Sequence, residues 1–272
     1  MQHAPRKRFG QNFLKDNSII EKILFNININ NNDFFLEIGP GLGALTKPLM
    51  SKLGEKSKLY AVEIDKDLAA YLSKIYKNES RFILYSKDIL KTEIEDIFKK
   101  DPIKTLRVVG NLPYNISTQL IFHLLSNKFR KKNGDLIIED MHFMLQKEVV
   151  DRMIASPGCK DYGRLSIMVQ YHCEVEDLFL VPSTAFKPEP KVKSKVIRLK
   201  PFLNKDLNQN EEIILAMLVK KCFEQRRKTL KNSLKKFFSE KEFEMLKINP
   251  NSRPELLSIN DFKKLAKIFK ET

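Results

Sequence analysis

The sequence predicts an α/β protein in which a doubly wound, mostly parallel sheet ends in an antiparallel strand and is followed by a small all-helical domain. Two observations predict this fold class. Over the first two thirds of the chain, apolar runs of strand length alternate with segments of helical spacing, which is typical of a parallel sheet covered on both faces. After about residue 202 the apolar residues keep helical spacing, and almost no strand pattern remains.

Four buried strands are predicted in order along the first half of the chain. The first is DFFLEIGP (33–40), a short apolar run that ends in Gly and Pro. The next three are KLYAVEID (58–65), RFILYSKDI (81–89) and TLRVVGNLPY (105–114). Between and after them, apolar residues at helical spacing predict helices at 41–52, 66–77 and 117–127.

The second half contributes three more strands before the pattern changes. MHFMLQKEVV (141–150) predicts a strand that runs into a helix. DLFLVP (177–182) and KVKSKVIRLKP (191–201) are joined by a proline-rich loop that cannot house a crossover helix, so we expect them to pair antiparallel at the sheet edge. The expected division is one domain over 1–202 and a helical domain over 203–272.

The charge of the chain favours a polyanionic partner. Lys and Arg number 49 against 34 Asp and Glu, a formal net charge of +15, which suits nucleic acid or an anionic membrane surface. A composition rich in Lys, Asn and Ile inflates this number, so charge alone leaves the partner open. No apolar run has the length of a bilayer span and no signal peptide is visible, so we expect a cytoplasmic protein without a membrane partner.

Cysteine and histidine usage gives no sign of a metal centre. The 3 cysteines and 4 histidines are scattered without metal-ligand spacing. Buried free thiols in a reducing compartment are the simplest interpretation. We therefore expect neither a disulfide framework nor a metal site.

A glycine-rich turn, Glu37-Ile38-Gly39-Pro40-Gly41-Leu42-Gly43, follows the first predicted strand. Glycines let a backbone turn tightly and approach a ligand closely. A nicotinamide dinucleotide is the competing ligand, but the G-x-G-x-G spacing lacks the third glycine position of that fingerprint. Glu37 also stands beside the turn, where it disfavours a pyrophosphate. S-adenosylmethionine has no phosphate and carries a cationic amino group and a sulfonium, and it fits this pattern.

Acidic residues end the second and third predicted strands. Glu63 is placed to accept both ribose hydroxyls of a cofactor, and Asp88 to accept from its adenine amino group. Taken singly, either residue is equally well an ordinary strand-end residue or a helix cap. Because the carboxyl ends of parallel strands converge, the ordered series of Gly39, Glu63 and Asp88 predicts one cofactor site.

Asn111-Leu112-Pro113-Tyr114 follows the fourth predicted strand, where a substrate would face the cofactor. The exocyclic amine of adenine is a poor nucleophile because its lone pair is delocalised into the ring. The side-chain carbonyl of Asn111 and the backbone carbonyl of Leu112 are able to hold both amine protons and favour a pyramidal nitrogen. Pro113 fixes the backbone without adding a donor, and Tyr114 offers a flat surface for a flipped-out base. The loop by itself predicts an amino methyltransferase that acts on a nucleobase, and adenine fits this chemistry.

Two features outside the sheet ends bear on substrate binding. Phe186, in the proline-rich segment 183–190, is a candidate for the opposite face of the base stack, and packing under a rigid turn is the alternative. Arg226, Arg227 and Lys228 form a basic cluster in the helical domain. Arginines suit phosphate contacts, so we expect this cluster to position RNA without reading its sequence, although basic helices are commonly only solvated.

Taken together, these residues resemble the small-subunit (16S) rRNA adenine N6,N6-dimethyltransferase family over nearly the whole chain. Its fold is the Rossmann-like methyltransferase sheet. One connection, KFRKKNGDLIIE (128–139), is longer and more basic than is usual in the family. The matching segments are KRFGQNFLKD (7–16), LEIGPGLGALT (36–46), VEID (62–65), KDIL (87–90), VVGNLPYNIS (108–117), MLQKEV (144–149), YGRLS (162–166), VPSTAFKPEPKVKSKVIRL (181–199) and FEQRRKTLKNSL (223–234).

The resemblance implies roles for the cofactor-binding residues. Asn12 and Leu14 close over the methionine end of S-adenosylmethionine, and Gly39 lines that end. Glu63 holds the ribose and Asp88 holds the adenine. No metal is implied.

The resemblance also implies the substrate. Asn111 contacts both the cofactor and the target, which is a pair of neighbouring adenosines in a hairpin near the 3′ end of small-subunit rRNA. Each base is methylated twice, so four cofactor molecules are consumed per rRNA. The implied partner is an assembling small subunit (a pre-30S particle), and the expected oligomeric state is a monomer.

Three other functions compete with this one. A macrolide-resistance-type large-subunit rRNA adenine N6-methyltransferase shares the glycine turn and the NLPY-type loop, but YGRLS and the RRKTLKNSL helix favour the small-subunit enzyme. DNA adenine methyltransferases usually carry Asp-Pro-Pro-Tyr or a close relative. A ribosome-assembly or nucleic-acid-binding factor with vestigial methylation is disfavoured because the predicted site residues are intact.

Overall fold

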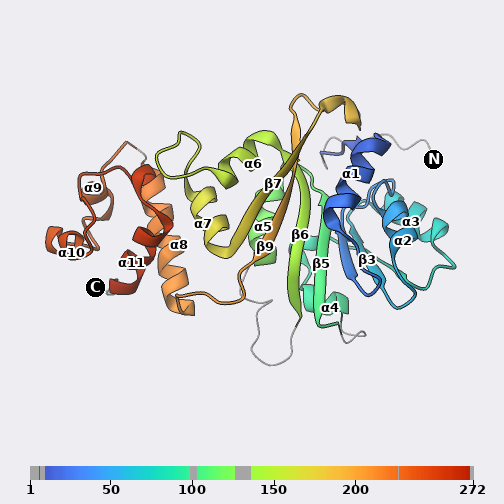
Figure 1. The fold of residues 1–272 in the computed structure, drawn as a ribbon, viewed down its shortest axis with the longest axis horizontal. Coiled ribbons are helices and arrows are strands. Elements are labelled where there is room, and N and C mark those ends of the chain that lie inside the picture. Colours follow the sequence, from blue (N-terminus) through green and yellow to red (C-terminus); the bar gives the residue numbers. More distant parts are fainter. Residues whose placement is uncertain (1–5, 7–9, 99–102, 126–135, 226, 270–272) are drawn as a thin grey trace. The chain divides into compact units, whose positions relative to one another are not determined.

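The computed structural model describes residue 6 and residues 10–98, 103–125, 136–225 and 227–269. The chain forms two compact units (Figure 1). The first contains residues 1–150 and 176–201, and the second contains residues 151–175 and 202–272. The second of the two chain segments in this unit thus starts at residue 202, where the sequence pattern changes. It also takes in residues 151–175, which the division at 202/203 assigned to the first domain.

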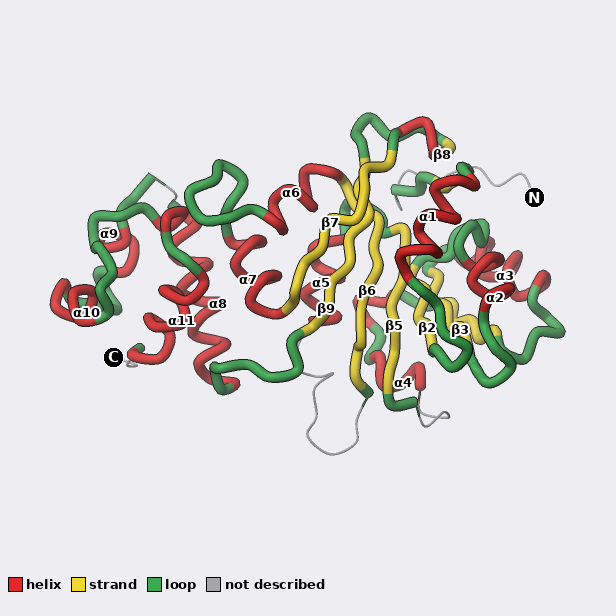
Figure 2. The backbone as a smooth tube through the Cα atoms, in the orientation of Figure 1, coloured by secondary structure: helices red, strands yellow, loops and turns green. Residues whose placement is uncertain are grey.

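In the described residues, seven strands form one mixed sheet (Figure 2). β2 pairs in parallel with β3 and β5, β3 with β4, and β5 with β6, whereas β9 runs antiparallel to β6 and β7 is the neighbour of β9 at the edge. The doubly wound sheet with a reversed strand near its end is therefore confirmed. In sheet order the strands are β4 (Phe82–Ser86), β3 (Lys58–Glu63), β2 (Phe34–Ile38), β5 (Thr105–Asn111), β6 (Ile137–Gln146), β9 (Ser194–Pro201) and β7 (Cys173–Val181).

Helices cover both faces of the sheet. On one face Phe35 of β2 belongs to a hydrophobic core that buries side chains of three helices. On the other face Tyr60 of β3 contacts Phe98, with ring centroids 4.6 Å apart. Successive residues of a strand point to opposite faces of the sheet, and both faces are covered. The central strands are therefore apolar over most of their length. The helices of the first face are α1 (Asn17–Ile27), α2 (Thr46–Lys52) and α3 (Lys66–Ile75), and α4 (Ile94–Phe98) and α5 (Ser117–Leu125) follow later in the chain.

The glycine-rich turn delays the helix that follows β2. Helical spacing predicted a helix from residue 41, but α2 begins at Thr46. Gly39, Gly41 and Gly43 have φ angles of 68°, 60° and 85°, in the left-handed region that a right-handed helix excludes. The five residues that precede the helix therefore form a turn whose backbone lines the sheet end.

The N-terminal segment is held against the loop that joins β7 to β9. β1 (Phe13–Leu14) pairs antiparallel with β8 (Phe186–Lys187) in a separate two-stranded sheet, which the sequence pattern did not predict. The backbone N–H of Lys15 also donates to the carbonyl of Ala185 at 2.9 Å. This pairing places residues 10–15 beside the carboxyl ends of the main strands.

The second unit is helical. The apolar pattern over 211–238 predicted continuous helical spacing, but α8 ends at Glu224 and a separate α9 starts at Leu230. The first N–H groups of α9 donate to the carbonyls of Pro250 and Ser252, each at 2.9 Å, so this turn packs on a neighbouring loop. No helix in the described ranges is long and apolar enough to cross a membrane. The helices are α7 (Arg164–His172), α8 (Gln209–Glu224), α9 (Leu230–Leu234), α10 (Glu240–Met245) and α11 (Ile259–Ile268), and α6 (Lys147–Ile154) bridges β6 to this unit.

Candidate active site

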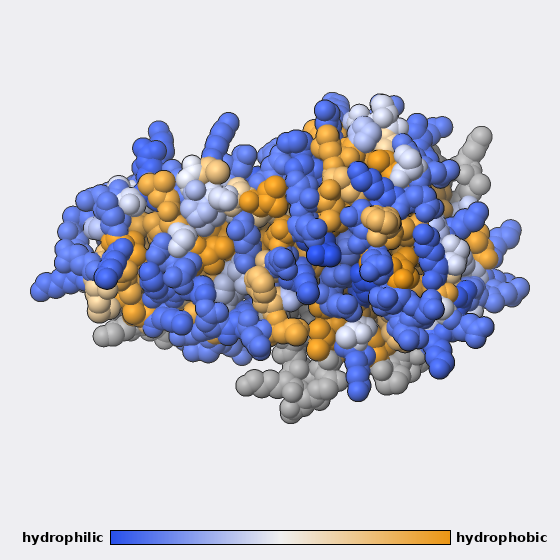
Figure 3. Space-filling view, in the orientation of Figure 1, coloured by the Kyte–Doolittle hydropathy of each residue, from blue (hydrophilic) through white to orange (hydrophobic). Residues whose placement is uncertain are grey.

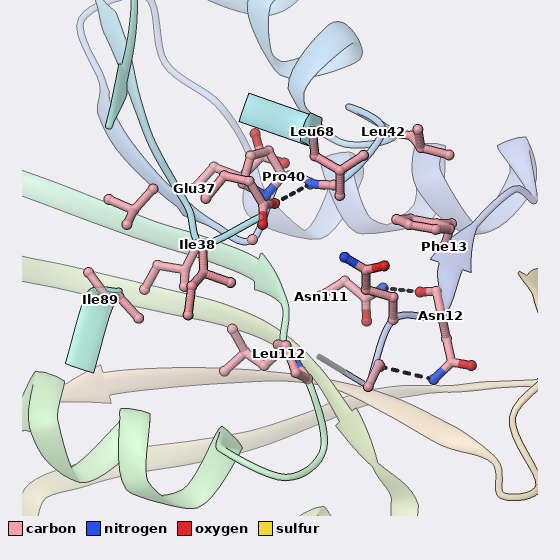
Figure 4. A pocket seen from close by; sticks show the side chains of 18 of the residues that line it. Asn12, Phe13, Glu37, Ile38, Pro40, Leu42, Leu68, Ile89, Asn111 and Leu112 are labelled. Carbon is pink, nitrogen blue, oxygen red and sulfur yellow. Dashed lines mark hydrogen bonds between the residues drawn. The ribbon is translucent and has the colours of Figure 1, made fainter. Parts of the chain in front are cut away.

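A cavity with an empty volume of about 1000 Å³ opens at the carboxyl ends of the strands of the first unit. Its walls come from the N-terminal segment, the glycine-rich turn and the ends of β3, β4 and β5 (Figure 4). Ligands of open parallel sheets bind at this edge. The predicted catalytic and cofactor-binding residues that line the cavity are Asn12, Leu14, Gly39, Glu63, Asp88, Asn111, Leu112, Pro113 and Tyr114.

Glu63, the last residue of β3, is held by the backbone of two loops. Its Oε2 accepts a hydrogen bond from the N–H of Gly41 at 3.0 Å, and its Oε1 accepts one from the N–H of Asp65 at 2.9 Å. The side chain is 4% exposed, and burial raises its pKa despite these hydrogen bonds. Each carboxylate oxygen retains a further lone pair, so Glu63 is oriented to accept from a pair of neighbouring hydroxyls.

A second carboxyl group, that of Glu37, lies in the same cavity wall. Thr46 Oγ1 donates to Glu37 Oε2 at 2.7 Å, and the residue is 2% exposed. Burial, opposed by this hydrogen bond and reinforced by the charge of Glu63, raises the pKa of Glu37 to about 8. The site thus holds two carboxyl groups away from water, an arrangement that favours a cationic ligand.

Gly39 leaves open space where a side chain would stand. Its φ of 68° is in the left-handed region, and a Cβ built on it would meet nothing within 4 Å. A Cβ on Gly41 would instead lie 3.2 Å from the ring of Phe13 in the N-terminal segment. The glycine-rich turn therefore gives a ligand room at Gly39 and receives the N-terminal segment at Gly41.

Asp88 both caps a helix and lines the cavity, the two roles between which the sequence left the choice open. It caps the short 3-10 helix η2 (Ile89–Lys91), because its Oδ1 accepts from the N–H of Leu90 at 3.0 Å. It also lines the cavity, as do its chain neighbour Ile89 and the exposed Ile64. Capping uses one carboxylate oxygen, so the other remains able to accept from an amino group at the edge of an apolar slot.

Asn111, the last residue of β5, is tied to the N-terminal segment. Its Nδ2 donates to the backbone carbonyl of Asn12 at 2.9 Å, and Asn12 Nδ2 donates to the carbonyl of Gly10 at 3.3 Å (Figure 4). The amide group of Asn111 is therefore oriented by its donor, and its carbonyl oxygen is the atom left for a substrate amine. The two predicted residues Asn12 and Asn111 are brought together.

The rest of the predicted catalytic loop is fixed at both ends. The N–H of Leu112 donates to the carbonyl of Met144 in β6 at 3.2 Å, and the Leu112 side chain is buried. Tyr114 is half-buried, and its hydroxyl lies 2.8 Å from Ser194 Oγ. Burial raises the pKa of Tyr114, opposed by the hydrogen bond with Ser194, so the phenol stays protonated at neutral pH.

Phe186 does not line the cavity in this structure. It pairs with Leu14 across the β1–β8 ribbon and is 1% exposed, inside the hydrophobic core of the first unit. A ring covered in this way offers no face to a base. In this structure Phe186 thus packs in the core, as the alternative interpretation predicted. The ring would have to become exposed before it could stack on a base.

The predicted RNA-binding residues lie in the second unit. Arg227 and Lys228 are exposed in the turn between α8 and α9, whereas Arg226 lies outside the described residues. Figure 3 shows that hydrophilic side chains cover most of the visible surface, as the lysine-rich composition predicts. Exposure is consistent both with phosphate contact and with simple solvation.

Sequence reasoning missed the group that anchors the N-terminal segment. Asp65 is fully buried, and its carboxylate accepts from Arg6 Nη1 and from Gln11 Nε2, each at 3.1 Å. Arg6 also forms an ion pair with Asp67. These partners lie more than fifty positions apart in the chain, so no local pattern revealed them. The anchor joins Arg6 and Gln11 to the loop after β3, close in sequence to Glu63.

The lining fits a cationic ligand with an apolar and a polar part, as S-adenosylmethionine has. Glu37 and Glu63 supply buried carboxyl groups, Gly39 leaves space against the backbone, and Ile64 and Ile89 supply apolar surface. Among the described lining residues Lys87 is the basic one, and it is exposed at the rim. No group of three or more potential metal ligands occurs in the described part of the chain.

Comparisons with known proteins agree with this geometry. The sequence model of a family described as "Ribosomal RNA adenine dimethylase" matches residues 2–271. The "Ribosomal RNA small subunit methyltransferase A" of Pseudomonas aeruginosa is 49% identical over 97% of this chain and 94% of its own. The crystal structure of a dimethyladenosine transferase from Plasmodium falciparum is 27% identical with a TM-score of 0.76, covering 94% of this chain and 99% of its own.

A second solved structure shares the fold. The 23S rRNA methyltransferase ErmE is 23% identical, with a TM-score of 0.68 over 94% of this chain and 98% of its own. This likeness concerns the fold alone. The family predicted from the motifs is confirmed by the match over residues 2–271 and by the identity of 49%. The chain belongs to the ribosomal RNA adenine dimethylase family.

Proposed function

We propose that this protein transfers methyl groups from S-adenosylmethionine to N6 of two adjacent adenosines in a hairpin near the 3′ end of small-subunit rRNA. One observation carries the proposal. Asn111, oriented by its hydrogen bond to Asn12, lines the same cavity as Glu63 and Asp88. A relative that is 49% identical over nearly the whole chain bears the name of a small-subunit rRNA methyltransferase, which supports the choice of substrate.

The methyl donor binds along the carboxyl edge of the sheet. Glu63 accepts from the ribose hydroxyls, and Asp88 accepts from the adenine amino group, with the adenine ring in the apolar slot beside Ile89. The backbone of Gly39 runs along the methionine end, and Asn12 covers it. The donor supplies a methyl group activated by a positively charged sulfur. The two buried carboxyl groups of the cavity favour that charge.

The target adenine enters beside Asn111. The Asn111 carbonyl oxygen and the Leu112 backbone carbonyl accept the two amine hydrogens, which favours a lone pair on N6 directed at the methyl group. N6 forms a bond to the methyl carbon as the carbon–sulfur bond breaks and its electrons stay on sulfur. One amine proton then leaves to water. Positioning therefore does most of the catalysis, and no strong general base is required.

Tyr114 and Pro113 form the platform for the flipped-out base, and Phe186 is the proposed second wall. Because Phe186 is buried in the core where β8 pairs with β1, this second contact requires β1 to move away from β8 when RNA binds. The same segment carries Asn12 at the cofactor end. Opening of residues 10–15 would therefore serve both exchange of the methyl donor and entry of the base.

The second unit is proposed to position the substrate. Arg227 and Lys228, together with Arg226, contact phosphates of the assembling small subunit. The domain division proposed for function is thus a methyltransferase domain over 1–202 and a ribosome-contacting domain over 203–272. We propose that the protein acts as a monomer on a pre-30S particle, and hence in the cytoplasm, where ribosomal subunits are assembled.

Mapping of the modified base tests the proposal. The protein is incubated with labelled S-adenosylmethionine and, separately, with small and large ribosomal subunits that lack the relevant methyl groups. Primer extension on each rRNA is expected to stop at two adjacent adenosines near the 3′ end of the small-subunit rRNA. A stop only in large-subunit rRNA would assign the macrolide-resistance type of activity. Subunit binding without any transfer would favour an assembly factor.

A further inference from the structure

The hydroxyl of Tyr114 and the side chain of Ser194 form a hydrogen bond between two segments that are 80 positions apart. Tyr114 Oη lies 2.8 Å from Ser194 Oγ. Ser194 is the first residue of β9 and is fully buried. It does not line the cavity, whereas Tyr114 does. Ser194 therefore reaches the site only through Tyr114.

The strand that carries Ser194 is rigidly supported. Ser194 pairs with Gln146 at the end of β6, and the N–H of Lys147 donates to the carbonyl of Lys193 at 2.9 Å. The backbone of Ser194 is thus fixed by an antiparallel ladder with β6, the strand that pairs with β5 on its other side. Through its hydrogen bond, Ser194 therefore holds the hydroxyl of Tyr114 at a fixed place relative to the sheet.

A tyrosine in a loop needs such a second attachment to serve as a platform. The side chain turns about two bonds, so a ring anchored only through Cα samples several orientations. The carbonyl of Tyr114 accepts from Ser117 Oγ at 3.3 Å, which holds the backbone. The bond to Ser194 holds the opposite end of the side chain. With both ends held, the long axis of the ring keeps one direction and position at the cavity.

We propose that Ser194 is a positioning residue for methyl transfer, which holds the ring of Tyr114 in the orientation that stacks the target adenine. This inference rests on the proposed function. Ser194 touches neither the methyl donor nor the base, so it sets the rate of transfer and leaves the binding of S-adenosylmethionine unchanged. It also gives a role to a residue of the segment 181–199 that the base and cofactor contacts do not use.

A double-mutant cycle tests the proposal. Ser194→Ala and Tyr114→Phe each remove one partner of the same hydrogen bond while keeping the ring, and the double variant removes both. Each single variant is expected to lower kcat for methyl transfer to unmethylated small subunits by about three- to tenfold, the range expected for one hydrogen bond. The double variant is expected to be no slower than either single variant. Multiplied effects, or full activity of Ser194→Ala, would overturn the proposal.

Ser57→Ala is the matched control. Ser57 is also fully buried, and its Oγ donates to the carbonyl of Asn31 at 2.7 Å, but it does not line the cavity. We expect Ser57→Ala and Ser194→Ala to lower the unfolding temperature to a similar extent, with slower transfer only in Ser194→Ala. The dissociation constant of S-adenosylmethionine is expected to stay within about twofold in all variants. An equal loss of activity in Ser57→Ala would show that Ser194 acts only through the stability of the fold, and would overturn the proposal.

A measurement without RNA separates this proposal from the proposed function. The protein is labelled with 3-fluorotyrosine, and the fluorine resonance of Tyr114 is identified by its absence in Tyr114→Phe. In Ser194→Ala this resonance is expected to shift and narrow, because the hydroxyl loses its partner and the side chain moves more freely. An unchanged resonance would contradict the tether. If the tether is present but no RNA is methylated, the proposed function fails and the structural role of Ser194 stands.

Discussion

Asn111 Nδ2 donates to the backbone carbonyl of Asn12 at 2.9 Å, although the two residues are 99 positions apart in the chain. The bond joins the predicted catalytic loop to the N-terminal segment, and both line the cavity. It uses the donor of the Asn111 amide and leaves its carbonyl oxygen for the substrate. The Asn111 carbonyl, the proposed acceptor, is therefore oriented through the N-terminal segment.

Replacement of Asn111 tests its role as that acceptor. Asn111→Ala is expected to lower kcat for methyl transfer by about 100- to 1000-fold, as loss of one preorganised hydrogen-bonding group does in other enzymes. Binding to small subunits, measured by co-sedimentation, is expected to stay within about threefold, since the residues proposed to contact RNA phosphates, Arg227 and Lys228, are unchanged. Asn26→Ala is the control, because Asn26 Nδ2 likewise donates to a backbone carbonyl, that of Lys22, away from the cavity. Comparable activity in the two variants would remove Asn111 from the mechanism.

Substitution of Gly39 tests the space reserved for the methyl donor. Gly39→Ala places a methyl group in the open region of the cavity and forces a left-handed φ on a residue with a Cβ. Gly158→Ala is matched to it, because Gly158 has φ 86° and no atoms near its Cβ position either, but it lies in the second unit. Both variants are expected to lose about 1 to 2 kcal/mol of unfolding free energy. Isothermal titration is expected to show weaker S-adenosylmethionine binding only for Gly39→Ala, and equal binding would contradict the assignment.

The buried carboxyl group of Glu37 predicts a pH dependence of stability. The folded protein holds this group with a pKa of about 8, against 4.5 for an ordinary glutamate. Between these values the folded state binds more protons than the unfolded state, so the unfolding free energy contributed by Glu37 falls as pH rises. The slope is at most about 1.4 kcal/mol per pH unit. Urea denaturation at pH 6.5 and 8 is expected to show a smaller fall for Glu37→Gln than for the wild type. Equal falls would contradict a raised pKa.

The same group predicts proton release when the methyl donor binds. A cation near Glu37 favours the ionised carboxylate, so the proton that Glu37 holds near neutral pH leaves on binding. Titration calorimetry of S-adenosylmethionine at pH 7 in two buffers of different ionisation enthalpy reports the number of protons released. Glu37→Gln is expected to release fewer protons than the wild type. The neutral-sulfur product, S-adenosylhomocysteine, is expected to release fewer protons than the methyl donor in the wild type.

Removal of two exposed basic residues tests the contact with RNA. Arg227→Ala combined with Lys228→Ala is expected to weaken subunit binding and to reduce the slope of log affinity against log salt by about 2, one for each lost phosphate contact. Lys74→Ala combined with Lys77→Ala removes the same charge from the exposed side of the first unit. Filter binding over 50 to 300 mM salt separates the two variants. An unchanged slope in the Arg227 and Lys228 variant would make those residues only solvated charges.

The main sheet and the meeting of the predicted site residues in one cavity could be predicted from the sequence. Gly39, Glu63 and Asp88 each follow a short apolar run, and the parallel topology necessarily brings those strand ends together. Asn111 was found in the same way, because it ends the fourth run. In each case a local pattern identified the strand. The general rule that the carboxyl ends of parallel strands lie at one edge of the sheet then predicted that these residues come together.

Contacts between distant segments could not be predicted in this way. The pairing of Leu14 with Phe186, which buries the predicted stacking ring, depends on two short strands with no pattern of their own. Burial of Asp65 by Arg6 and Gln11 also leaves no local signal. The break between α8 and α9 arises because a neighbouring loop binds the first N–H groups of α9, whereas the spacing of apolar residues continues through it.

The central claim is double methylation of two adjacent adenosines of small-subunit rRNA, and methyl stoichiometry tests it most directly. Small subunits lacking these groups are incubated to completion with labelled S-adenosylmethionine, and the digested rRNA is analysed by mass spectrometry. The account predicts four methyl groups per subunit, all as N6,N6-dimethyladenosine in one fragment near the 3′ end. Monomethylated adenosine alone, methyl groups confined to large-subunit rRNA, or no incorporation would contradict it.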